Sequence, residues 1–151
     1  MTDLPLVDQS TDSNWRPALA SAALAIALFA ITLGGTYIYD DLYIIGLDPR
    51  IKDPSLWGQF WTKDYFNGGA DNLYRPLVSM SYAVQWQLHG DRPWAFHLVN
   101  VLLHALASAG VAELARRLGG LRVGYVAGLL FAAHPVHVEA VANIVGRAEL
   151  A

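Results

Sequence analysis

Two adjacent carboxylates, Asp40 and Asp41, stand where an apolar run ends in the stretch "TLGGTYIYDDLYIIG", residues 32–46. Close carboxylates repel each other, and partial desolvation raises a carboxyl pKa, so one member of such a pair can become a competent proton acceptor. Adjacent side chains on a helix point about 100° apart, which favours a division of roles within the pair. The pair therefore predicts either a general base at an apolar–polar boundary or the solvated end of a helix, and the residues alone leave both open.

A second group of residues suited to chemistry lies near the end of the chain, in "HPVHVEAVANIVGRAEL". His134, His137 and Glu139 offer three ligand side chains within six residues. They do not form the HExxH pattern of a zinc-binding helix, and Pro135 interrupts any helix here, so the spacing gives zinc little support. Arg147 is suited to a bidentate phosphate contact or to snorkelling toward lipid headgroups.

A polar stripe made of His97, Asn100 and His104 follows the spacing i, i+3 and i+7 along one helix face. Polar side chains at membrane depth usually face other helices or a water-filled cavity. Hydrogen bonding between helices is the interpretation we prefer, and a metal site is the alternative.

The composition indicates a membrane protein. Of the 151 residues, 54% are hydrophobic and 15% are charged, whereas a soluble domain carries about 25% charged residues. The absence of cysteine excludes disulfides and thiolate metal sites. A net charge of −3 without a Lys/Arg cluster does not indicate nucleic-acid binding.

Three apolar windows predict transmembrane helices over residues 17–39, 93–115 and 123–138, the last of them short for a full crossing. A cleaved signal peptide is the competing interpretation of the first window. Three aspartates precede that window and bulky aromatic residues follow it, which favours a permanent anchor. The apolar piece at residues 76–88 is too short to span and predicts a helix that lies against the membrane or against other helices.

Charge asymmetry predicts the orientation of the chain in the membrane. The turn at 116–122 is rich in arginine and suits the cytoplasmic side, together with the N-terminal tail, residues 1–16. The loop at 40–92 carries seven acids against five bases and suits the external side, as does the segment 139–151. Both groups of chemically active residues would then face one side of the membrane.

The external loop contains "DPSLWGQFWTKDYF", in which Asp53 can cap a helix that begins with proline. Leu56, Trp57, Phe60 and Trp61 fall on one face at helical spacing. Because the loop is short for building a core, we expect an amphipathic helix on the membrane surface. A core helix of a small external domain is the alternative.

Several of these motifs occur together in a known family. "YDDLYII", "YRPL", "FHLVNVLLH" and "LLFAAHPVHVEAVANIVGRAEL" resemble, in order and spacing, the N-terminal part of the transmembrane and tetratricopeptide-repeat (TMTC-like) O-mannosyltransferases and their bacterial relatives, within the GT-C class of glycosyltransferases. The resemblance covers residues 37–151. It implies that Asp40 and Asp41 form the catalytic acidic motif, with Asp40 the first choice for the base. The matched positions expected to bind substrate or phosphate are Arg75, His134, His137, Glu139 and Arg147.

The resemblance also implies a fold and a reaction. We expect an all-α membrane protein with three transmembrane helices and external juxtamembrane amphipathic helices, the N-terminal fragment of a polytopic GT-C fold that is inactive alone. The implied enzyme transfers a sugar, with mannose the first candidate, from a polyprenyl- or dolichyl-phosphate donor to a hydroxyl of an acceptor protein or glycan. Its partners include membrane lipids and no nucleic acid.

The resemblance implies no required cofactor and is compatible with a divalent metal ion. The alanine-rich first helix and the absence of cysteine favour a bacterial inner membrane over the endoplasmic reticulum. The alternative function is a non-catalytic membrane scaffold or transport subunit, in which the polar stripes would only pack helices.

Overall fold

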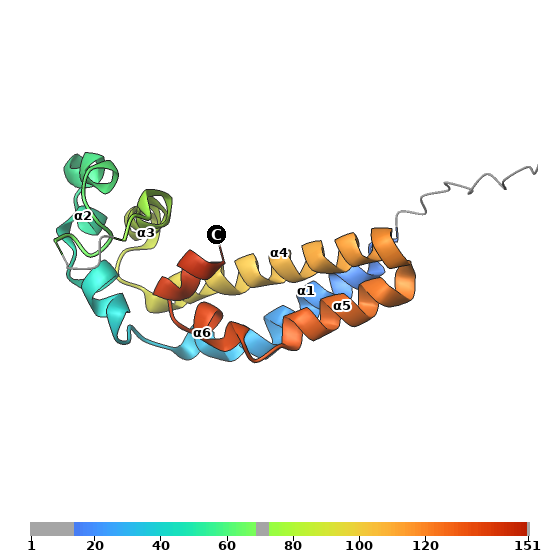
Figure 1. The fold of residues 1–151 in the computed structure, drawn as a ribbon. Helices are drawn as coiled ribbons and strands as arrows, with labels where there is room; N and C mark the ends of the chain where they lie inside the picture. Colours follow the sequence, from blue (N-terminus) through green and yellow to red (C-terminus); the bar gives the residue numbers. More distant parts are fainter. Residues whose placement is uncertain (1–13, 69–72, 151) are drawn as a thin grey trace, which may run out of the picture.

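The computed structural model describes residues 14–68 and 73–150, and every regular element in these ranges is helical. The predicted tail up to residue 13, and residue 151, lie outside the described residues. Three helices lie side by side in an elongated bundle (Figure 1): α1 (Arg16–Phe29), which the 3-10 turn η1 (Ala30–Gly34) extends, α4 (Pro93–Gly119) and α5 (Leu121–Ala133).

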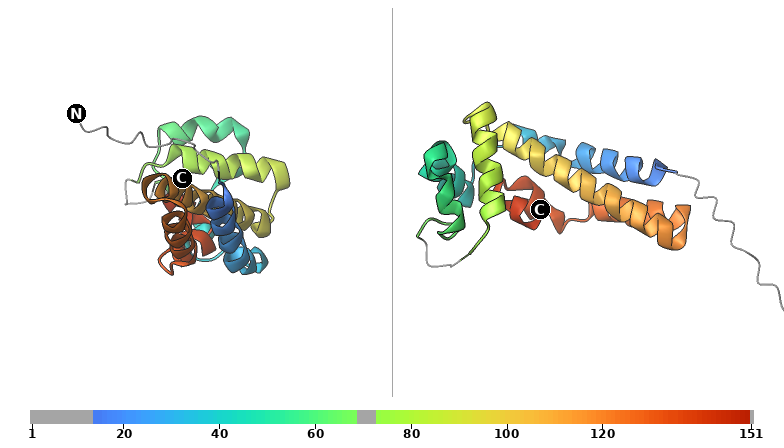
Figure 2. Two further views of the ribbon diagram at one scale, coloured as in Figure 1. Left: turned by 90° about the vertical axis from the view of Figure 1, so that its right-hand side faces the viewer. Right: turned by 90° about the horizontal axis from the view of Figure 1, so that it is seen from above.

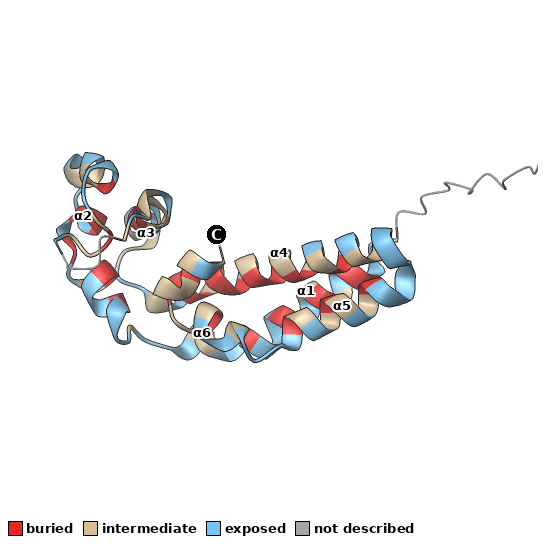
Figure 3. Ribbon diagram, viewed as in Figure 1, coloured by how far each residue is buried: buried red, intermediate tan, exposed pale blue. Residues whose placement is uncertain are grey.

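Small residues line the faces on which the bundle helices meet. A Cβ atom added at Gly128 of α5 would overlap Ser21 Oγ of α1 and the Cβ atom of Ala112 in α4, and one added at Gly124 would lie 2.9 Å from the carbonyl oxygen of Ala112. In a membrane, lipid is as apolar as the helix side chains, so burying those side chains does not drive helices together. Small residues let the helices approach closely and gain van der Waals packing energy instead. The buried faces follow these contacts along the bundle (Figure 3).

Two helical stretches are long and apolar enough to cross a membrane: Arg16–Gly34 with 19 residues and Pro93–Gly119 with 27. The third bundle helix, α5, has 13 residues, which span ~20 Å at 1.5 Å per residue. Compared with the predicted window 123–138, this helix begins two residues earlier, at Leu121, and ends five residues earlier, at Ala133. The helix ends at Ala133 because His134 has an extended ψ of 127°, as expected for a residue that precedes proline.

The polar stripe of α4 is used mainly for hydrogen bonds between segments. Asn100 Nδ2 donates to the carbonyl oxygens of Asn143 (2.9 Å) and Ile144 (3.0 Å). His104 Nε2 lies 3.2 Å from the carbonyl oxygen of Ala132 in α5. The contact of His104 confirms the preferred interpretation of hydrogen bonding between helices, whereas Asn100 bonds to two non-helical residues, Asn143 and Ile144. His97 is buried, and neither ring nitrogen has a hydrogen-bond partner among the described residues.

The loop between the first two long helices folds into a compact unit at one end of the bundle. Its elements are the π-helical turn η2 (Leu42–Gly46), α2 (Pro49–Lys52), the 3-10 helix η3 (Pro54–Trp61) and α3 (Pro76–His89). Helix α3 lies across the bundle direction (Figure 2). Asp53 caps η3 as predicted, because its carboxylate accepts from the backbone N–H of Ser55 at 2.9 Å.

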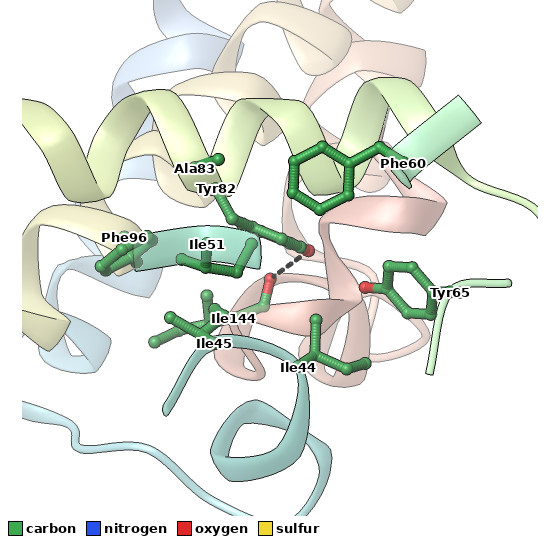
Figure 4. Close-up of a cluster of buried hydrophobic side chains, with 9 residues drawn as sticks. All are labelled: Ile44, Ile45, Ile51, Phe60, Tyr65, Tyr82, Ala83, Phe96 and Ile144. Atoms are coloured by element: carbon green, nitrogen blue, oxygen red, sulfur yellow. Dashed lines mark hydrogen bonds between the residues drawn. The ribbon is translucent and has the colours of Figure 1, made fainter. Parts of the chain in front are cut away.

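This unit has a buried core, contrary to the expectation that the loop is too short to build one. Phe60 of η3 is buried in it, Trp57 packs against it, and Trp61 is exposed. The expectation failed because the loop does not build the core alone: Phe96 comes from α4 and Ile144 from the C-terminal segment. The buried cluster (Figure 4) consists of Ile44, Ile45, Ile51, Phe60, Tyr65, Tyr82, Ala83, Phe96 and Ile144.

A buried ion pair fixes the middle of the unit. Arg50 Nη2 lies 2.7 Å from an oxygen of Asp48, and both side chains are almost fully buried. The remaining Arg50 donors reach the carbonyl oxygens of Asp64 and Tyr65, each at 3.0 Å. A buried charge is tolerated when it is paired and its other donors are satisfied, as they are here. The pair joins α2 to the segment that follows η3.

The close packing at Gly128 yields a stability prediction. We expect Gly128→Ala to destabilise the chain by about 1–3 kcal/mol, the usual cost of overpacking, because the added methyl group meets Ser21 and Ala112. The measurement is thermal unfolding in detergent micelles. Gly110→Ala in α4 is the matched control, since a Cβ atom there meets no atom within 4 Å. Equal melting temperatures for the two variants would contradict the proposed packing.

Candidate functional site

The two adjacent aspartates occupy different environments. The Asp41 side chain is buried and accepts three backbone N–H groups: Oδ1 from Val145 at 2.8 Å, and Oδ2 from Ile38 at 3.2 Å and from Ile144 at 3.5 Å. Burial raises the pKa of Asp41, and the three N–H donors oppose that rise. Asp41 thus joins the turn after the first helix to a segment more than 100 residues further along the chain.

Asp40 is exposed and lines a cavity of about 640 Å³, which we call the Asp40 cavity. The residue before it, Tyr39, has a φ of 44°, in the left-handed region that residues with a Cβ atom seldom adopt. The turn and the buried neighbour together direct Asp40 toward the open space. The other titratable residues that line the cavity are Arg75, His104, His137, Glu139 and Glu149.

Arg75 is the only Lys or Arg side chain among the described residues that line the cavity. Its Nη2 atom lies 3.4 Å from Glu149 Oε1, and its guanidinium lies 5.7 Å from the centre of the Tyr65 ring. Arg75 belongs to the turn before α3, where Pro76 begins the helix. The predicted phosphate-binding arginine therefore faces the same space as Asp40.

The two histidines of the C-terminal motif lie differently. His137, the first residue of α6 (His137–Ala142), lines the Asp40 cavity, with its ring centre 4.8 Å from that of His104. Burial, followed by the nearby rings of His104 and His134, lowers the pKa of His137. A neutral imidazole contributes hydrogen bonds to a phosphate but no charge. His134 lies outside the cavity, and its Nδ1 accepts from the backbone N–H of Val136.

Arg147 does not reach the cavity. It is 2% exposed, and its guanidinium donates to Asn100 Oδ1 (3.0 Å), to Ser81 Oγ (3.0 Å) and to the carbonyl oxygen of Phe96 (3.2 Å). The group also lies over the Tyr82 ring, 4.5 Å from its centre. Burial lowers the pKa of Arg147 to about 10, so it stays protonated at neutral pH. Arg147 therefore lies away from the cavity at which a phosphate contact was expected, and its contacts link three segments of the chain.

Glu139 and Glu149 both line the cavity. Glu139 was expected there, whereas the ion pair of Glu149 with Arg75 was not predicted, since it joins residues 74 positions apart. Nor was His104 assigned to the site, because its stripe indicated helix packing. Its place beside the short α5 brings it to the cavity as well. Among the described residues, no group of three or more His, Asp or Glu side chains is arranged to hold a metal ion.

An apolar groove of about 410 Å³ adjoins the Asp40 cavity. It runs between α4 and α5, and we call it the α4–α5 groove. Val111, Ala127 and Leu130 line its apolar part, while Phe131, Val136 and His137 line both the groove and the cavity. A polar cavity and an apolar groove thus share a boundary at one end of the bundle.

Together, the two long apolar helices and the all-helical architecture indicate an integral membrane protein with a polar cavity at one end of its helix bundle. The chain is 38% identical over 140 residues to the protein O-mannosyl-transferase TMTC2 of Mus musculus, an alignment that covers 87% of this chain and 16% of the relative. Tmtc2 of Drosophila melanogaster is 39% identical over 140 residues, which is 88% of this chain and 15% of the relative. TMTC1 of Homo sapiens is 34% identical over 145 residues, which is 89% of this chain and 16% of the relative.

These relatives are TMTC proteins, which confirms the resemblance inferred from the motifs of the chain. The chain spans a small part of the length of the curated relatives that it matches. No protein-family model and no solved structure matches the chain. These relatives are animal proteins, so they give no support to the preference for a bacterial inner membrane.

The environment of Asp41 predicts a structural rather than a chemical effect of its substitution. In Asp41→Asn, one carboxylate oxygen becomes an NH₂ group that faces backbone N–H donors, which leaves at least one buried N–H unpaired. We expect a loss of about 1–3 kcal/mol of unfolding free energy, measured as a lower melting temperature in detergent micelles. Asp40→Asn, at an exposed position, is the control and should change stability by less than about 0.5 kcal/mol. Equal effects of the two substitutions would contradict this difference between the aspartates.

Proposed function

We propose that the chain contributes the reactive centre of a membrane glycosyltransferase of the GT-C class. The enzyme transfers mannose from a polyprenyl- or dolichyl-phosphate donor to a hydroxyl group of an acceptor protein. The mannose and the protein acceptor are taken from the relatives, which are named protein O-mannosyl-transferases. The phosphate-linked lipid donor follows from the family resemblance and agrees with the chemistry of the cavity.

The observation that carries the proposal is the meeting of Asp40 and Arg75 in one cavity. A transfer of this kind needs a base for the acceptor hydroxyl and a cation near the leaving phosphate. Asp40 is exposed and lines the cavity, whereas Asp41 is buried, does not line the cavity, and accepts backbone N–H groups on both oxygens. Asp40 is therefore the base in this proposal, and Asp41 is the residue that positions it.

The α4–α5 groove supports a donor with a lipid tail. A lipid-linked sugar keeps its hydrocarbon chain in the membrane while its phosphate and sugar lie at the boundary with water. The groove is lined by apolar residues of α4 and α5 together with His134, and it meets the cavity at Phe131, Val136 and His137. A tail in the groove would bring the phosphate to Arg75 and the sugar to Asp40.

The reaction proceeds as a single displacement in this proposal. Asp40 takes the proton of the acceptor hydroxyl as the oxygen attacks the anomeric carbon of the sugar. The bond between that carbon and the phosphate oxygen breaks, and its electron pair stays on the departing lipid phosphate. Arg75 stabilises the negative charge that grows there. His137 and Glu139 line the same space and are the proposed hydrogen-bonding partners of the substrates.

The proposed arrangement in the membrane places the cavity on the external side. Three crossings, with α5 as a short third one, put the arginine-rich turn between α4 and α5 on the cytoplasmic side. This places Asp40 and the C-terminal segment together on the opposite side. The contact between Asp41 and Val145 supports a shared side, because it joins the two segments directly.

The base assignment predicts a large loss of turnover in Asp40→Asn. We expect kcat for sugar transfer from a polyprenyl-phosphate donor to an acceptor peptide to fall by about 10²–10⁴-fold, with an unchanged melting temperature. The assay uses membranes that contain the full-length protein. Asp91→Asn, an exposed acid outside the cavity, is the matched control.

Two outcomes would contradict the proposal in different ways. Normal turnover in Asp40→Asn would show that another group takes the proton, while the transferase function would stand. Failure of the unaltered protein both to bind the donor and to transfer sugar would favour the non-catalytic scaffold or transport subunit instead.

A further inference from the structure

The ion pair between Arg75 and Glu149 joins two segments that line the Asp40 cavity. Arg75 precedes α3, and Glu149 ends the 3-10 helix η4 (Val145–Glu149), so the contact links positions 74 residues apart. Both side chains line the cavity. The carboxylate of Glu149 is thus paired with Arg75, the one arginine that lines this cavity in the described part of the chain.

The Arg75–Glu149 pair is loose, whereas the Arg50–Asp48 pair is tight. Arg75 Nη2 lies 3.4 Å from Glu149 Oε1, and the two side chains are 32% and 65% exposed. Arg50 Nη2 lies 2.7 Å from Asp48 Oδ2, with side-chain exposures of 1% and 4%. An exposed pair with one long contact is screened by water and contributes little to stability. Glu149 can therefore leave Arg75 at small cost.

Arg75 has a second contact that does not depend on Glu149. Its guanidinium lies 5.7 Å from the centre of the Tyr65 ring, within the range of a cation–π interaction. Tyr65 is buried in the cluster of apolar side chains drawn in Figure 4. Departure of Glu149 would therefore leave Arg75 held at the cavity with its donors free.

The charges around the cavity favour such an exchange. Asp40, Glu139 and Glu149 place three carboxylates around one arginine. A phosphate that enters this space is repelled by the carboxylates and attracted by Arg75 alone among the Lys and Arg side chains of the described lining. The planar guanidinium forms paired, charge-assisted hydrogen bonds with a phosphate. Glu149 competes for those same donors.

We propose that Glu149 occupies the position on Arg75 that a phosphate group takes, so that the ion pair is exchanged when a phosphate-bearing ligand binds. The inference rests on the proposed function for the identity of the ligand, a lipid phosphate. It adds a residue that sets ligand affinity without taking part in the displacement. Loss of the Glu149 carboxylate should then tighten phosphate binding, whereas loss of Arg75 should weaken it.

The test is direct binding, measured by isothermal titration calorimetry on the protein in detergent micelles. The probe is citronellyl phosphate, a short isoprenoid phosphate, and citronellol is the matched compound without the phosphate. We expect Glu149→Gln to bind citronellyl phosphate about two- to fivefold more tightly, the range that corresponds to an exposed ion pair. Citronellol should bind the two proteins equally. Arg75→Ala should lose most of the preference for the phosphate compound.

A double-mutant cycle separates competition for Arg75 from a general change in charge. In the Arg75→Ala background, Glu149→Gln should no longer tighten binding, because the contested donor is absent. Glu139→Gln removes another cavity carboxylate that has no ion pair with Arg75 in the structure, and it should give a smaller gain than Glu149→Gln.

Weaker binding in Glu149→Gln would overturn the inference, since Glu149 would then hold Arg75 in place for the ligand. An equal gain from Glu149→Gln in both backgrounds would overturn it too, because the effect would not pass through Arg75. Equal affinity of the unaltered protein for citronellyl phosphate and citronellol would contradict phosphate recognition itself, and with it the proposed function.

Discussion

The helical backbone is interrupted between α6 and η4, and the other contacts of the site depend on the hydrogen bonds that hold this break in place. Buried N–H and C=O groups must find partners. Asn143 and Ile144 lie between the two helices while Val145 begins η4, so the N–H groups of Ile144 and Val145 have no partner within a helix. The N–H groups of Ile144 and Val145 donate to Asp41. The carbonyl oxygens of Asn143 and Ile144 accept from Asn100, and that of Ile144 also accepts from the Tyr82 hydroxyl. Three side chains from distant segments therefore hold this break in place.

The same contacts fix the orientation of the residues that face the cavity. Asn100 bonds to the break through its amide nitrogen, and its oxygen accepts from Arg147, which in turn reaches α3 through Ser81. Asp41 is tied to the break, and its neighbour Asp40 is directed outward. Arg147 is likewise buried, while Glu149, two residues further on, reaches the cavity. Asp41 and Arg147 are thus buried and hold the structure, whereas Asp40 and Glu149, one and two residues away from them, line the cavity.

Features that depend on local sequence were predicted well, and features that depend on distant contacts were not. The apolar windows located the three bundle helices, and Asp53 and Pro54 marked the start of η3. The buried core that the loop helps to build was missed because Phe96 was assigned to the membrane-spanning window 93–115, and Ile144 lies far from the loop in sequence. Arg75 and Arg147 carry the same side chain, and only the folded chain exposes one at a cavity and buries the other.

The contrast between Asp40 and Asp41 shows why a raised pKa alone is a poor guide to the base. Burial raises the pKa of Asp41, which by itself is typical of catalytic carboxyl groups. To accept a proton from a substrate, however, a carboxylate must be within reach of that substrate, and the Asp41 side chain is buried and does not line the cavity. Both Asp41 oxygens accept backbone N–H groups that belong to the fold. Protonation of Asp41 would weaken its hydrogen bonds to the N–H groups of Ile38, Ile144 and Val145. Asp41 is therefore suited to stabilise the structure, and the exposed Asp40 is suited to react.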